Sequence, residues 1–139
     1  MSAATGQYGE LLTSIVMLVS RVLLALIFIH EGIFLVLNFD TVSASMVKLG
    51  VPGILLIPTI VLQLLAGLSI VIGWQVRLAA TALGLFCLMT AFSFHMNFDN
   101  RNELLHFEKD LAIAGGMFVL ALSNANGSPW FRRYRIFKP

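Results

Sequence analysis

Residues 54–94 read ILLIPTIVLQLLAGLSIVIGWQVRLAATALGLFCLMTAFSF, two long apolar runs joined by a short polar link. The first run covers Ile54 to Ile72 and the second covers about Leu78 to Phe94. Each is close to the roughly 20 residues that an α-helix needs to cross the hydrocarbon core of a bilayer. The stretch therefore predicts two transmembrane helices connected by a tight turn at residues 73–77.

Two further apolar runs flank this pair. One covers about residues 11–37, interrupted by Arg21 and by His30–Glu31, and the other covers about residues 111–122. The last run reaches spanning length if its helix starts near Phe107. The first run is overlong, so we expect either an interfacial stretch before Arg21 or a longer, tilted helix. The chain is thus predicted to be all-α, a polytopic integral membrane four-helix bundle.

The composition favours the same fold class. Of the 139 residues, 58% are hydrophobic and only 12% are charged, whereas about a quarter of the residues in a soluble domain are charged. Lipid must therefore cover much of the exterior, and we expect membrane lipid, not nucleic acid, as a partner. We divide the chain into an N-terminal interfacial or extended helix (1–20), a four-helix transmembrane domain (21–123) and a basic cytoplasmic tail (124–139).

The distribution of basic residues predicts the orientation in the membrane. The tail carries Arg132, Arg133, Arg135 and Lys138, and Arg77 lies in the short link at residues 73–77. An even number of spans places the tail and this link on one side, together with Arg21. Both termini are therefore expected to be cytoplasmic, in a multi-pass protein of a bacterial inner (plasma) membrane. The residues before Leu11 contain no Lys or Arg, so we expect the N-terminal segment to be retained and not cleaved as a signal peptide.

Polar groups inside the predicted spans call for a structural or functional reason, because a charged group at the centre of a membrane helix costs roughly 2.5–3.5 kcal/mol. We expect Glu31 to face inward and to pair with Lys109, either only to fix helix packing or to line a pocket for a polar head group such as a quinone carbonyl. His106 is expected in a loop. The ionisable groups gather in the outer half of the bundle, and Gln63 lies near the middle of its helix. The candidate ligand-binding residues are His30, Glu31, Gln63, His95, Lys109 and Asp110.

Haem and metal sites are less favoured by the sequence. A bis-histidine haem needs two imidazoles at matched depth, and His30 is expected to lie deeper than His95. The single cysteine, Cys87, excludes an internal disulfide and a Cys-x-x-Cys pair. We assign no catalytic residue, no metal ligand and no intrinsic cofactor, and we do not expect an independent catalyst.

Several segments resemble the DoxX family of membrane proteins. Residues 21–32 (RVLLALIFIHEG) resemble the family's first helix, and residues 63–80 (QLLAGLSIVIGWQVRLAA) resemble its second helix and tight turn. His95 resembles the histidine that closes the third helix. Residues 106–116 (HFEKDLAIAGG) are similar to the fourth-helix motif Phe-x-Lys-Asn-x-Ala-x-x-Gly-Gly. The order and spacing agree from about residue 21 to residue 122.

The chain departs from the family pattern at three positions. The family often has Glu where Gln63 stands, Asn where Asp110 stands, and Lys where Leu35 stands. The Glu and the Lys are lost together, which could remove one internal pair without leaving an orphan charge.

The resemblance implies a four-helix membrane bundle associated with respiratory or redox chemistry. The leading hypothesis is an accessory subunit of a membrane redox complex, associated with quinone through the outer-half pocket. The alternatives are a structural or assembly subunit without a ligand and a small membrane carrier. The expected protein partner is a larger membrane complex or a second copy of the chain.

Overall fold

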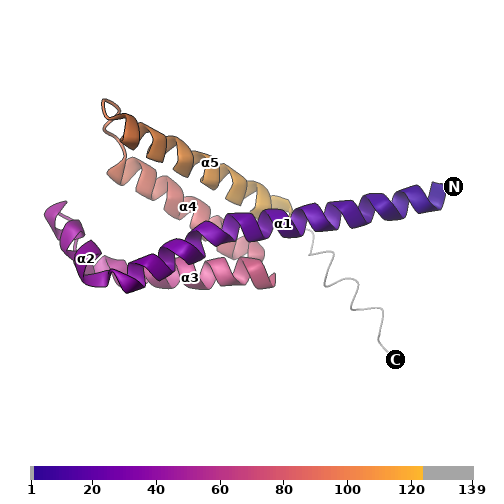
Figure 1. The fold of residues 1–139 in the computed structure, drawn as a ribbon, viewed down its shortest axis with the longest axis horizontal. Helices are drawn as coiled ribbons and strands as arrows, with labels where there is room; N and C mark the ends of the chain where they lie inside the picture. The colour runs from indigo at the N-terminus through magenta and orange to yellow at the C-terminus, as the bar shows by residue number, and fades with distance from the viewer. Residues whose placement is uncertain (1, 124–139) are drawn as a thin grey trace.

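The computed structural model describes residues 2–123, which form helices joined by short links (Figure 1). The elements in chain order are α1 (Ser2–Leu37), α2 (Phe39–Lys48), the 3-10 turn η1 (Gly53–Leu55), α3 (Leu56–Ile72), α4 (Val76–Phe94) and α5 (Arg101–Ser123). The prediction of a basic tail at residues 124–139 lies outside the described residues.

The molecule is a polytopic helical membrane protein. Within the described chain, three segments are long and apolar enough to cross a bilayer: Tyr8–Leu37, Gly53–Ile72 and Val76–Phe94. The helices predicted at residues 54–72 and 78–94 are thereby confirmed. α5 has 23 residues, enough for a span, but its first half carries charged side chains, including Glu108, Lys109 and Asp110. These charges lower its mean hydropathy although its second half is apolar.

The helices associate as two antiparallel pairs, α1 with α3 and α4 with α5. The pairs meet around the α3–α4 turn and diverge away from it (Figure 1). Small residues allow the close contacts that hold membrane helices together. Gly67 lies against Ile29, and Gly84 lies against the Phe118 ring. The buried core fills the region where the pairs meet, with contributions from Ala25, Phe28, Ile70, Ala80, Leu83 and Met117.

Arg21 fixes the join between α1 and α3. Its side chain is only 5% exposed, and its guanidinium donates to the Ile70 carbonyl from Nε (3.0 Å) and Nη2 (2.7 Å). Nη2 also lies 3.3 Å from the Val71 carbonyl. Gly73 ends α3 in the left-handed conformation (φ 88°), and a Cβ there would come within 2.6 Å of Arg21 Nη2. The turn therefore needs glycine both for its backbone angle and for the space that the guanidinium occupies.

The connection between the first two spans contains a helix that the sequence analysis did not predict. α2 follows Asn38 directly, and it has Asp40 in its first turn and Lys48 in its last. These charges complement the helix dipole. None of its residues is fully buried, and its packing is limited to contacts with the end of α1 and with η1, where Ser43 lies against Gly53.

The start of α5 was also predicted wrongly. The helix begins at Arg101, not near Phe107, so His106 lies inside a helix and not in a loop. The reason is an N-cap: Asn100 Oδ1 accepts from the backbone N–H of Asn102 at 3.0 Å, and its carbonyl accepts from Leu104. Such a cap satisfies donors that the first helical turn would otherwise leave free.

Candidate functional site

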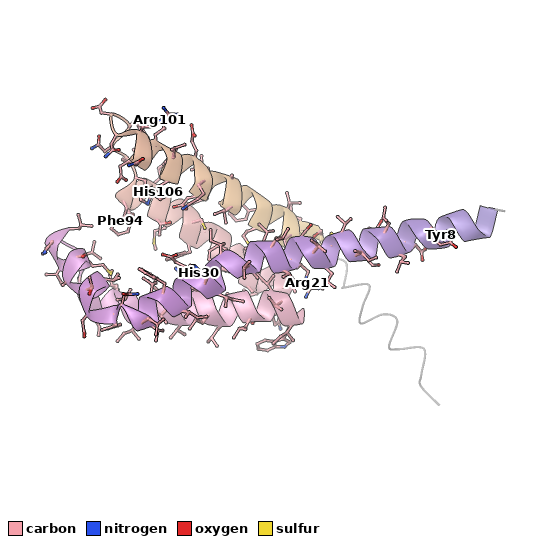
Figure 2. All side chains as sticks on the ribbon, in the orientation of Figure 1. Tyr8, Arg21, His30, Phe94, Arg101 and His106 are labelled. Atoms are coloured by element: carbon pink, nitrogen blue, oxygen red, sulfur yellow. The ribbon has the colours of Figure 1, made fainter. Side chains whose placement is uncertain are left out.

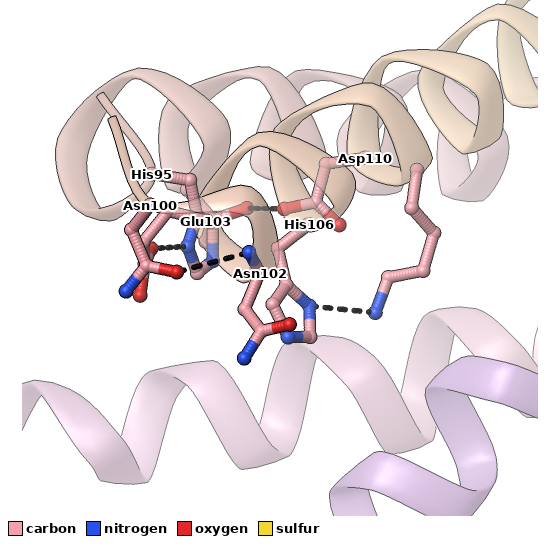
Figure 3. A network of polar contacts seen from close by, with 8 residues as sticks. His95, Asn100, Asn102, Glu103, His106 and Asp110 are labelled. Carbon is pink, nitrogen blue, oxygen red and sulfur yellow. Dashed lines mark hydrogen bonds and ion pairs between the residues drawn. The ribbon is translucent and has the colours of Figure 1, made fainter. Parts of the chain in front are cut away.

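Polar side chains of α4 and α5 meet at the outer end of these two helices (Figure 3). His95 directly follows α4, and its Nδ1 lies 2.6 Å from Glu103 Oε2 on α5. The His95 ring stacks on the His106 ring, with centroids 5.2 Å apart and 24° between the planes. Lys109 Nζ lies 3.2 Å from His106 Nδ1. We call these four residues, His95, Glu103, His106 and Lys109, the outer cluster.

The contacts of the outer cluster define the hydrogen-bonding role of each imidazole. An ammonium group can only donate, so His106 Nδ1 must accept from Lys109, and its ring proton is on Nε2. His95 Nδ1 faces a carboxylate oxygen, so it donates. The pair His95–Glu103 is a hydrogen bond when the imidazole is neutral and an ion pair when it is protonated. In the two stacked rings, therefore, Nδ1 of His95 donates a hydrogen bond and Nδ1 of His106 accepts one.

Asp110 lies deeper between α4 and α5 than the outer cluster. Its Oδ2 is 3.3 Å from the Thr90 hydroxyl, and that hydroxyl is also within 2.9 Å of the Cys87 carbonyl. Phe107 lies nearby, edge-on to Phe92 and Phe98 at centroid distances of 5.4 and 5.2 Å. These aromatic rings of α4, α5 and the loop between them thus lie near the contact of Asp110 with Thr90.

Gln63 is the buried polar residue of the α1–α3 pair. It is 4% exposed and belongs to the buried face of α3, together with Ala66, Gly67 and Ile70. Its Oε1 has no hydrogen-bond partner within the described chain. Gly32 of α1 lies opposite, where an added Cβ would be 3.5 Å from Gln63 Cβ. The side chain is therefore enclosed by closely packed helices, and its Oε1 is left without a partner.

His30 and Glu31 lie on α1 beside Gly32, and both are exposed. The expectation that Glu31 faces inward is wrong, and its expected ion pair with Lys109 is not formed among the described residues, because Lys109 contacts His106 instead. Close packing at Gly32 explains this: the inward position is taken by a residue without a side chain, which turns Glu31 outward.

The predicted site residues therefore form two groups at different depths. An α-helix rises about 1.5 Å per residue, so Gln63 lies about 15 Å along α3 from Gly73, and His30 lies about 14 Å along α1 from Arg21. Thr90, beside Asp110, lies about 21 Å along α4 from Val76. The structure brings His95, Lys109 and Asp110 together on α4 and α5, whereas His30, Glu31 and Gln63 belong to the other pair. Figure 3 shows His106 pointing from α5 toward that other pair.

Glu103 and His106 are the members of the outer cluster that the sequence analysis missed. A usable signal was present, because Asn100 followed three residues later by Glu103 is typical of a helix N-terminus. A helix starting there places Glu103, His106 and Lys109 at spacings of three, which puts them near one face. Within residues 2–123, no group of three or more His, Cys, Asp or Glu is arranged to hold a metal ion.

Comparison with known proteins gives consistent matches. The family model described as DoxX matches residues 16–96. "Inner membrane protein YqjF" of Escherichia coli (strain K12) is 37% identical over 106 residues, covering 76% of this chain and 82% of that protein. "Inner membrane protein YphA" of the same organism is 29% identical over 126 residues, covering 86% and 90%. No solved structure matches the chain significantly.

Proposed function

The chain belongs to the DoxX family of membrane proteins, and we propose that it is an accessory subunit of a respiratory or other redox complex that holds a quinone-type head group. It is a multi-pass protein of the bacterial inner membrane, as its relatives are. The proposed site lies in the outer half of the bundle, between Gln63 on one helix pair and the outer cluster on the other.

The unpaired Gln63 amide carries the proposal. Buried polar groups are almost always hydrogen-bonded, and leaving one unsatisfied costs about 1–3 kcal/mol. Gln63 Oε1 is such a group among the described residues. A primary amide can donate to a carbonyl and accept from a hydroxyl. A quinone presents only carbonyl acceptors, whereas its reduced quinol presents hydroxyl groups. A quinol hydroxyl that donates to Oε1 would remove the penalty.

The surroundings support a ligand with an apolar tail and a polar head. His30 on α1 and His106 on α5 lie toward the end where the helix pairs diverge (Figure 2). Lys109 and His106 are exposed on α5, and Phe92 and Phe107 supply aromatic surface nearby. An apolar wall with a few polar groups is typical of sites for such molecules. In this proposal the protein positions the head group, and redox chemistry belongs to its partner complex.

The alternative function, a structural or assembly subunit without ligand, is favoured by one observation. His95 and Glu103 satisfy each other at 2.6 Å, and the cluster joins α4 to α5 without any added group. In that case the cluster stabilises the α4–α5 hairpin and nothing occupies the Gln63 site.

Gln63→Met separates the two functions, because it removes the amide while keeping a side chain of similar length. We expect the protein in lipid nanodiscs to bind a short-chain ubiquinone, more tightly in its reduced quinol form, and Gln63→Met to weaken quinol binding about tenfold, the equivalent of one hydrogen bond. Binding is measured by quenching of tryptophan fluorescence. The ligand-free variant should be at least as stable as the unmodified protein, because an unsatisfied group has been removed.

Thr59→Val is the matched control, since Thr59 lies on the same helix and its hydroxyl bonds only to Leu55 of that helix. It should leave quinone binding unchanged. Absence of quinone binding by the unmodified protein would overturn the proposal. So would equal binding by Gln63→Met, or a clear loss of ligand-free stability in that variant.

A further inference from the structure

The first half of α1 extends beyond the rest of the helix bundle (Figure 1). Among residues 8–20 no side chain is buried, and from Tyr8 onward Arg21 is the first residue of α1 that is buried against another helix. Tyr8, Leu12 and Val16 are among its most exposed apolar side chains. An apolar surface of this kind must meet something other than bulk water.

Residues 8–20 have two distinct faces. With about 100° between successive residues, Glu10, Thr13, Ser14 and Ser20 fall, together with the single apolar residue Met17, on the arc that continues the buried arc of Arg21, Ala25 and Phe28. The opposite arc, which we call the outer arc, is apolar throughout and consists of Tyr8, Leu11, Leu12, Ile15, Val16, Leu18 and Val19. This separation of polar and apolar faces is the pattern of a helix at a boundary between water and an apolar phase.

The outer arc continues without interruption into the membrane-spanning half of α1. Leu23 and Leu26 lie on the same arc and are exposed, and in a membrane protein this surface of the bundle contacts lipid. The arc opposite the outer arc changes at Arg21. From Arg21 onward its residues contact the core, and before Arg21 it carries the polar side chains. The continuity of the outer arc identifies lipid as the neighbour of residues 8–20 as well.

Helix lengths place this segment at the inner boundary of the membrane. The apolar part of α1, Tyr8–Leu37, has 30 residues and is about 45 Å long, whereas the hydrocarbon core is about 30 Å thick. α3, with 17 residues, is about 25 Å long, and residues 21–37 of α1 match it. Residues 8–20 therefore extend about 20 Å beyond the level of Arg21, on the side that carries Trp74 and Arg77.

We propose that residues 8–20 lie inclined along the inner surface of the membrane, with the outer arc in the lipid and the polar arc toward head groups and water. Glu10 is the only charged residue of this segment, so its attachment depends on apolar burial and not on attraction to anionic lipids. The segment extends the lipid contact of the bundle on one side and presents Glu10, Thr13 and Ser14 to the cytoplasm.

Single spin labels test this placement. Cysteines are introduced one at a time in a Cys87→Ala background, at Leu12, Ile15 and Val19 on the outer arc and at Glu10, Thr13 and Ser14 on the polar arc. The labelled proteins are reconstituted in vesicles of phosphatidylcholine, with and without phosphatidylglycerol. Collision rates with oxygen report lipid exposure, and those with a water-soluble nickel chelate report water exposure. A label at Leu26 serves as the lipid-exposed reference.

We expect the outer-arc labels to resemble the Leu26 reference and the polar-arc labels to collide mainly with the nickel chelate, equally in both vesicle types. Exposure of every label to nickel would overturn the proposal, because the helix would then stand free in water. Exposure of every label to oxygen would also overturn it. Dipolar broadening between outer-arc labels would assign the arc to a second copy of the chain and not to lipid. Because every labelled position lies on the first half of α1, these outcomes do not depend on quinone binding.

Discussion

Arg21 donates hydrogen bonds to carbonyl groups at the C-terminal end of α3 that would otherwise have no partner. The last four carbonyls of an α-helix have no partner within the helix. In α3 the Ser69 carbonyl accepts from the N–H groups of Gly73 and Trp74, and the Ile70 and Val71 carbonyls accept from Arg21. A cation at a helix C-terminus is also favoured by the helix dipole. The charge in the apolar run of α1 is therefore offset by its contacts and has no need of an anionic partner.

Arg21→Met should destabilise the protein by about 2–4 kcal/mol, because it leaves the buried carbonyl of Ile70 and the part-buried carbonyl of Val71 without donors. The free energy of unfolding in mild detergent, followed through the fluorescence of Trp74 at the adjacent turn, measures the loss. Arg77→Met is the control, since Arg77 is exposed and its removal should change stability by less than about 0.5 kcal/mol. Equal effects of the two substitutions would contradict the assigned role.

At the scale of the helices, the two pairs are held by different close contacts. α4 and α5 approach where Gly84 lies under the Phe118 ring, and a Cβ at Gly84 would be 2.9 Å from Phe118 Cε1. α1 and α3 approach at Gly67 and Gly32. Gly115 of α5, by contrast, has open space around it. Only some of the small residues of this chain are therefore required for packing.

Gly84→Ala should weaken the α4–α5 contact and destabilise the protein by about 1–3 kcal/mol, because the added methyl overlaps an aromatic ring in a packed interface. Gly115→Ala is the matched substitution in an open position. It should be neutral or stabilise the protein by up to about 1 kcal/mol, the difference in helix propensity between the two residues. Denaturation by a graded detergent mixture compares the two variants, and a similar loss in both would show that Gly84 is not a packing contact.

At the scale of the whole molecule, α5 decides the topology. Three segments of the described chain are long and apolar enough to cross the membrane, and three crossings would place the two termini on opposite sides. A crossing by α5 makes the number even and puts the basic residues Arg132, Arg133, Arg135 and Lys138 on the same side as Arg77. That arrangement follows the preference of basic residues for the cytoplasm.

Reporter fusions test the crossing. A green fluorescent protein fused after Pro139 should fluoresce, and alkaline phosphatase fused at the same point should be inactive, because the tail is expected in the cytoplasm. Alkaline phosphatase fused after Asn100, in the outer loop between α4 and α5, should be active. An active phosphatase after Pro139 would mean that α5 does not cross and that the termini lie on opposite sides.

The sequence by itself determined the membrane environment, the two central spans and the turn between them. Long apolar runs favour lipid, and in lipid a helix satisfies the hydrogen bonds of its own backbone. It also placed His95 at the end of α4. The spacing of Asn100 and Glu103 in the sequence would have predicted the start of α5. The tertiary structure alone decided which polar groups meet. Arg21 donates to carbonyls of α3, Glu31 is exposed, and Gln63 is buried without a partner for Oε1. These outcomes depend on how each helix is rotated and how closely it packs. Rotation by one residue, about 100°, moves a side chain from the interior to the lipid, and no apolar run specifies that angle.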